Sequence, residues 1–226
     1  MTKLPRLSPT RTISLIYCAM IAAGTLLLLL PAASRDGETT GFLDALFTAT
    51  SALCVTGLIR FDTYTHWSLF GQIAILLMIQ VGGIGFMTIA ITFITMIRRK
   101  IGIGKRIMMQ ESIAAPQMGG IVKMTRFILI GTLILEAVGA ILLAFYFCPR
   151  FGLWQGVYFG IFHSISAFCN AGFDLMGVSM ANSSLTTAAD NIVVNLVIIA
   201  LIVIGGLGFF VWMDLWNNRF RLRKCR

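Results

Sequence analysis

Four long apolar blocks, separated by shorter and more polar stretches, run along the chain. They cover residues 12–33, 67–97, 124–148 and 191–216. Each is long enough for a helix to cross about 30 Å of hydrocarbon, because an α-helix rises about 1.5 Å per residue. The pattern therefore predicts four transmembrane helices. A signal peptide is the alternative for the first block, although its apolar core exceeds the roughly 7–15 residues typical of such peptides.

Two shorter apolar segments, residues 41–53 and 153–168, lie between the spans of each half. A helix over the first would rise only about 20 Å, which is too little to cross a bilayer. Backbone that turns back at membrane depth is tolerated where protein buries it or where it lines a water-filled cavity. We expect these segments to be re-entrant pore helices. The alternative is a pair of helices lying flat at the membrane surface.

The segment FTATSALCVTGL at 47–58 returns as FHSISAFCNAGF at 162–173. Aligned without a gap, the copies pair Phe47 with Phe162, Ser51 with Ser166, Ala52 with Ala167, Cys54 with Cys169 and Gly57 with Gly172. GGIGF at 82–86 and GGLGF at 205–209 then follow. We interpret the chain as an all-α membrane protein made of two tandem span–pore helix–span units. Two spans per unit leave both units in the same orientation, related by an axis along the membrane normal.

The predicted organisation has four parts. They are a first repeat at 1–97, a cytoplasmic linker at 98–122, a second repeat at 123–216 and a basic tail at 217–226. Residues 106–115 of the linker are a candidate surface helix. Docking of a cytosolic partner and simple solvation of the linker both remain open.

Composition and charge agree with a membrane protein. The chain is 58% hydrophobic, with a mean hydropathy of +0.88, well above a soluble domain. Of the 18 Lys and Arg residues, all but Arg35, Arg60 and Arg150 fall on one side of the predicted spans. This asymmetry places both termini in the cytoplasm of a multi-pass protein of the cell membrane. It also explains the net charge of +9 without nucleic acid.

Enzyme and metal chemistry are not indicated by the sequence. The five cysteines show no CxxC spacing, and the two histidines, His66 and His163, are isolated. No His–Cys cluster suggests a metal site. No nucleophile–base pair is present either, so we expect a protein that is not an enzyme.

The loops after the two pore helices are the candidate ion site. A dehydrated cation needs oxygen ligands, and backbone carbonyls supply them as neutral dipoles. Glycine permits the unusual backbone angles that align successive carbonyls. The helix C-terminus before each loop adds partial negative charge. The predicted ligands are the carbonyls of Cys54, Val55, Thr56, Gly57, Cys169, Asn170, Ala171 and Gly172.

Other residues are assigned supporting roles. Asp62 and Asp174 are candidate cation attractors at the outer mouth, or ordinary solvated acids. Glu136, inside the third span, is expected to have a structural partner, either a base on another span or the backbone of the linker; a protonated acid with its hydrogen bonds satisfied is the alternative. The glycine motifs sit in apolar spans and not in a βαβ unit, so helix packing or a hinge is expected rather than nucleotide binding. These glycines are Gly82, Gly83, Gly85, Gly205, Gly206 and Gly208.

The chain resembles the Trk/Ktr/HKT superfamily of potassium transporters, most closely the first half of the membrane subunit of bacterial Ktr systems. The similarity is carried by KLPRLSPTRTISLIY, TATSALCVTGL, GQIAILLMIQVGGIGFMTIA and SISAFCNAGFDL. The resemblance implies a K⁺-channel-like fold with Gly57 and Gly172 as filter glycines. It also implies K⁺ held by filter carbonyls alone, Na⁺ dependence, homodimeric membrane subunits and cytosolic nucleotide-binding regulatory subunits.

The chain departs from this family in repeat number, because family members carry four repeats and this sequence has two. We therefore expect either a homodimer or assembly with further pore repeats. The alternative function is a non-conducting, truncated or split partner of a complete transporter. Na⁺ as the main cargo also remains open.

Overall fold

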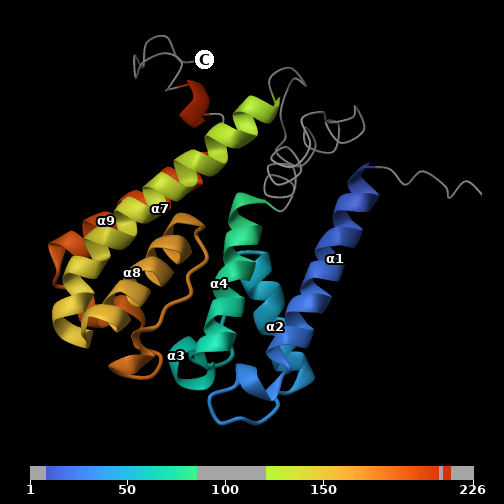
Figure 1. Ribbon diagram of the computed structural model, residues 1–226, viewed down its shortest axis with the longest axis horizontal. Helices are drawn as coiled ribbons and strands as arrows, with labels where there is room; N and C mark the ends of the chain where they lie inside the picture. Colours follow the sequence, from blue (N-terminus) through green and yellow to red (C-terminus); the bar gives the residue numbers. More distant parts are fainter. Residues whose placement is uncertain (1–8, 86–120, 209–210, 215–226) are drawn as a thin grey trace, which may run out of the picture.

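The computed structural model describes residues 9–85, 121–208 and 211–214 of the 226-residue chain. Over these residues the protein is helical and contains no strand, only an isolated bridge between Ser34 and Trp67. Figure 1 shows two groups of helices, one from each half of the sequence, standing next to each other.

Both halves follow the same order of a long helix, a shorter helix, a loop and another helix. The first half contains α1 (Pro9–Leu28), η1 (Pro31–Ala33), α2 (Phe42–Leu53), α3 (Thr63–His66) and α4 (Leu69–Ile84). The second contains α7 (Ile121–Phe151), α8 (Leu153–Phe168), η2 (Met176–Val178), η3 (Ser184–Ala188) and α9 (Ile192–Gly206). The predicted short helices at 41–53 and 153–168 thus exist as α2 and α8. Their depth in the bilayer stays a prediction.

The helix after each loop starts at a polar capping residue. The side chain of Ser68 accepts the backbone N–H of Gly71 before α4. Asn191 accepts the N–H of Val194 in the same way before α9. Such caps satisfy backbone donors that the first helical turn leaves unpaired. Helices α4 and α9 therefore begin with the same type of N-terminal cap.

Two helices in the described part of the chain are long and apolar enough to cross a membrane by length and composition, Thr10–Leu28 in α1 and Thr125–Phe151 in α7. The apolar helices α4 and α9 are shorter as described. The predicted spans at 67–97 and 191–216 continue into residues outside the described ranges. The predicted linker helix at 106–115 and the tail at 217–226 lie outside them entirely.

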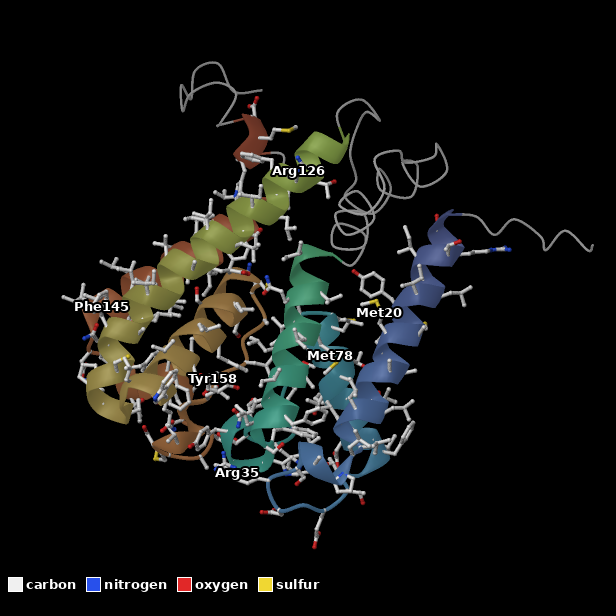
Figure 2. All side chains as sticks on the ribbon, in the orientation of Figure 1. Met20, Arg35, Met78, Arg126, Phe145 and Tyr158 are labelled. Carbon is white, nitrogen blue, oxygen red and sulfur yellow. The ribbon has the colours of Figure 1, made fainter. Side chains whose placement is uncertain are left out.

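Within each half, the pore-type helix packs against both long neighbours, α2 against α1 and α4, and α8 against α7 and α9. Helices α4 and α8 also pack together and join the halves. Large aromatic side chains fill the second half, where Phe147, Phe159 and Phe162 are fully buried. By contrast, Phe145 points away from α7 and is 75% exposed (Figure 2). Apolar side chains that face outward suit a lipid environment.

Candidate functional site

The first loop continues directly from the end of α2. The N–H of Thr56 donates to the carbonyl of Ser51 at 2.9 Å. Val55 has a φ of 55° and Gly57 a φ of 81°. Helices commonly end in this way, with a residue in the left-handed conformation and a backbone hydrogen bond that spans the last turn. Here valine occupies the left-handed position, which costs a branched side chain free energy.

The second loop repeats this path. The N–H of Ala171 donates to the carbonyl of Ser166 at 2.8 Å. Asn170 has a φ of 59° and Gly172 a φ of 73°. Left-handed residues therefore alternate with residues of negative φ in both loops. Such alternation tends to place successive peptide carbonyls on one side of the chain and N–H groups on the other.

The structure brings the two loops together at their glycines. A Cβ atom added to Gly57 would lie 2.7 Å from the carbonyl oxygen of Ala171. A Cβ added to Gly172 would lie 3.4 Å from the Cα of Gly57. Gly57 therefore admits no Cβ without a shift of backbone, whereas at Gly172 the positive φ is the main obstacle to a side chain. The two residues that the sequence paired as filter glycines are thus neighbours in space.

The glycine motifs of the following helices lie against the same region. A Cβ on Gly82 would collide with the carbonyl oxygen of Leu53, and one on Gly205 with that of Phe168. These two carbonyls end α2 and α8 respectively. A Cβ on Gly83 would collide with the sulfur of Cys169, across the boundary between the halves. Close approach of α4 and α9 to the loops therefore depends on small residues.

The remaining glycines of these motifs differ in their surroundings. Gly85 and Gly208 each have a φ of 83°, and each follows the end of a helix. The nearest atom to a Cβ on Gly206 would be the Asn170 amide nitrogen at 3.8 Å, which is ordinary contact. A hinge role for these positions stays a prediction.

The two acids assigned to the outer mouth have different environments. Asp62 is 8% exposed, and its carboxylate accepts the N–H groups of Tyr64 at 2.9 Å, Thr65 at 2.8 Å and Asn182 at 2.9 Å. It therefore links the first half to the second. Asp174 is partly exposed and lines a cavity of about 220 Å³ together with Gly172. The Asp174 carboxylate accepts one backbone N–H, that of Met176 at 2.9 Å. The Asp62 carboxylate accepts three.

Both histidines have structural partners. His66 hydrogen-bonds the hydroxyl of Thr40 at 3.0 Å. Burial lowers the pKa of His66, although the nearby carboxylates of Asp36 and Asp44 oppose this change. His163 accepts the N–H of Leu175 at 3.2 Å. Within the described ranges, no group of three or more His, Cys, Asp or Glu side chains could hold a metal ion.

Glu136 has a partner that the sequence did not suggest. Its carboxylate accepts the side-chain amide of Gln80 at 2.8 and 3.1 Å. The structural partner expected was a base or linker backbone, and the structure instead gives a neutral amide from the other half. The available signal was a glutamine in the middle of a largely apolar block.

Further side chains join α8 to α4 and to α3. The hydroxyl of Tyr158 donates to Gln72 at 3.1 Å, and Figure 2 shows Tyr158 on α8 near α4. Gln155 donates to the hydroxyl of Tyr64 at 3.0 Å. The boundary between the halves is therefore a polar seam, formed by Asp62, Tyr64, Gln72, Gln80, Glu136, Gln155 and Tyr158.

Comparison with known proteins identifies similar sequences among cation transport proteins. The TrkH family, described as cation transport protein, matches residues 3–222. The potassium/sodium uptake protein NtpJ of Enterococcus hirae is 44% identical over 97% of this chain and 47% of its own length. Ktr system potassium uptake protein B is 36% identical in Bacillus subtilis, over 95% of this chain and 46% of its own length. The protein of the same name in Vibrio alginolyticus is 33% identical over 92% of this chain and 44% of its own length.

The chain thus spans about half the length of the curated relatives that it matches. These relatives are transporters and not enzymes, in agreement with the absence of a catalytic motif from the sequence. The family match extends over almost every residue and includes both halves with their loops. The chain therefore belongs to the Trk/Ktr family of cation transport proteins.

Proposed function

We propose that this chain contributes two loops to a path along which monovalent cations, chiefly K⁺, cross a membrane. The carbonyls of residues 54–57 and 169–172 would replace the water shell of the ion. The observation that carries the proposal is the meeting of Gly57 and Gly172, at the ends of two loops with the same pattern of positive φ. The names of the relatives, which include potassium and sodium uptake, support the choice of cargo.

The helices before the loops favour the same chemistry. Helix α2 ends at Leu53 and α8 at Phe168, immediately before the loops. A helix C-terminus carries partial negative charge from its unpaired carbonyls. Two such ends directed at one region would stabilise a cation there without an acidic side chain. Asp174, beside the second loop, would raise the local cation concentration at the outer mouth.

The surroundings proposed for the protein are a lipid bilayer of the cell membrane. Outward-facing apolar side chains on α1 and α7 support this placement, and so does the hydropathy of both helices. Cytoplasmic termini follow from the Lys and Arg distribution. The re-entrant position of α2 and α8 is part of the proposal.

Internal symmetry supports assembly with further pore units. Phe162 on α8 is fully buried, whereas its counterpart Phe47 on α2 is 43% exposed. A Cβ on Gly83 of α4 would collide with Cys169, whereas one on its counterpart Gly206 of α9 would only make ordinary contact with Asn170. Among the described residues, one face of α2 and one of α9 are therefore less covered than the equivalent faces of α8 and α4. A second copy of the chain, or further repeats of the same kind, would fill both faces and complete the ring of loops.

Partners outside the membrane are proposed from the family. Relatives named as parts of a Ktr system imply a membrane component that works with other subunits. We propose a cytosolic nucleotide-binding regulatory subunit as one such partner, together with a dependence of uptake on Na⁺. Both follow from resemblance alone. Co-purification and uptake with and without Na⁺ would test them separately.

Rescue of a K⁺-uptake-deficient bacterium tests the proposed function. Expression of this chain should restore growth at limiting K⁺ and accelerate Rb⁺ uptake, while the Gly57→Ala variant should not. The mass of the assembly in detergent would show how many loops it contains. Normal membrane insertion without rescue, even at high expression, would favour the second candidate function, a non-conducting partner of a longer transporter. That candidate rests on the less covered faces of α2 and α9.

A further inference from the structure

Glu136 and Gln80 join the two halves deep among the helices. Glu136 lies in the middle of α7 and is 5% exposed. The Gln80 side chain on α4 donates to both of its carboxylate oxygens, at 2.8 and 3.1 Å. A buried acid within a membrane span is costly and is usually retained for a specific role. The contact between separate repeats suggests where that role lies.

The same acid is connected to the start of the second loop. The sulfur of Cys169 lies 4.0 Å from a Glu136 carboxylate oxygen, within reach of a thiol hydrogen bond. The hydroxyl of Ser164 donates to the Glu136 backbone carbonyl at 2.7 Å. Gly83, one turn beyond Gln80 on α4, packs against Cys169. Cys169 is thus held between residues of both halves.

Among the residues that the structure describes, the first loop has no equivalent arrangement. Gly24 and Gly139 are equivalent positions in the two repeats. Gly24 on α1 faces Ala49 on α2, and Gly139 on α7 faces Ser164 on α8. The same offset along α1 and α7 makes Ile21 the counterpart of Glu136, so the first repeat has an apolar residue where the second has the acid. The counterpart of Cys169, Cys54, is exposed. The acid and its amide partner therefore belong to the second loop alone.

We propose that Gln80 and Glu136 are positioning residues for the second loop. They hold Cys169 against the first half and so set the spacing between the carbonyls of the two loops. Discrimination between K⁺ and Na⁺ depends on the size of the carbonyl cage and the field of its dipoles. The effect on ion choice rests on the proposed function, whereas the effect on loop position does not.

A role for the pair in packing alone predicts different results. If the two residues only filled space, Gln80→Leu would be tolerated, and adding Glu136→Gln to Gln80→Glu would not restore the position of the loop. If they position the loop, Gln80→Leu removes the donor and leaves the acid without its partner. The double variant Gln80→Glu/Glu136→Gln then restores a carboxylate–amide pair in reverse order.

Alkylation of Cys169 in the full chain measures the loop position without any transport. Membranes are treated with N-ethylmaleimide, and the modification of each cysteine is followed by mass spectrometry, with exposed Cys54 as the internal reference. Gln80→Leu should raise the Cys169 rate relative to Cys54 by about tenfold, and the double variant should restore it. Gln72→Leu is the matched control, because Gln72 lies on the same helix but bonds Trp67 and Tyr158. An unchanged rate in Gln80→Leu, or no recovery in the double variant, would overturn the proposal.

Ion choice is measured in the same variants as the ratio of Rb⁺ to Na⁺ uptake. Gln80→Leu should lower this ratio by about tenfold, and the double variant should recover it. A mobile Cys169 with an unchanged ratio would refute the role in selectivity. Absence of uptake by the parent chain would count against the proposed function, and the alkylation result would still decide the positioning role.

Discussion

Gly57→Ala is the most direct test of the contact between the loops. Gly57 has a φ of 81°, and an alanine Cβ there would lie 2.7 Å from the carbonyl oxygen of Ala171. A left-handed alanine costs about 1–2 kcal/mol. The overlap with backbone adds about 1–3 kcal/mol, as overpacking generally does, or displaces the loop.

The control for this variant separates the two costs. Gly37 has a φ of 72°, and a Cβ there would meet nothing within 4 Å. Gly37→Ala therefore bears the left-handed cost without the overlap. Gly37 lies in the connection between η1 and α2, so the substitution should leave both loops unchanged. Any larger effect of Gly57→Ala then belongs to the loop contact.

Rb⁺ uptake, normalised to the amount of chain in the membrane, is the measurement. We expect Gly57→Ala to lose at least about tenfold in uptake, which corresponds to about 1.4 kcal/mol, because the carbonyls that hold the ion move. Gly37→Ala should stay within about twofold of the parent protein. Equal uptake by the two variants would refute the reasoning that Gly57 and Gly172 form one site.

Three further predictions follow from neighbouring contacts. Gly205→Ala should destabilise the folded chain, because its Cβ collides with the Phe168 carbonyl, whereas Gly206→Ala has room for the added Cβ. Thermal unfolding in detergent should show the two variants to differ in stability by about 1–3 kcal/mol. Equal stability of the two variants would count against close packing of α9 on the end of α8. Val55→Asn should stabilise the chain by about 1 kcal/mol, since asparagine tolerates the φ of 55° as Asn170 does; a lower unfolding midpoint would show that Val55 packing outweighs the strain. Asp174→Asn should reduce Rb⁺ uptake at low ionic strength and much less at high ionic strength, because salt screens a mouth charge; a loss independent of salt would contradict a steering role.

Periodicity and duplication in the sequence were enough to predict several parts of this molecule. The short helices at 41–53 and 153–168 are present with almost the same bounds, as α2 and α8. Gly57 and Gly172 were paired by alignment alone, and they prove to be neighbours. Such features are local or repeated, so apolar length and glycine position are sufficient to indicate them.

Partners across the boundary between the halves were not predictable in this way. Glu136 was expected to face a base or backbone, and Asp62 was grouped with Asp174 at the mouth. The packing of α4 against α8 instead gives Glu136 the amide of Gln80. The packing of α3 against η2 gives Asp62 the N–H of Asn182.

The sequence by itself determined the helical membrane class, the two repeats and the position of their loops, because hydrophobic length and repeated motifs are written along the chain. Only the tertiary structure decided which polar groups meet between the repeats. Side chains distant in sequence become partners through the angle and depth at which helices pack, and a one-dimensional pattern does not specify either quantity.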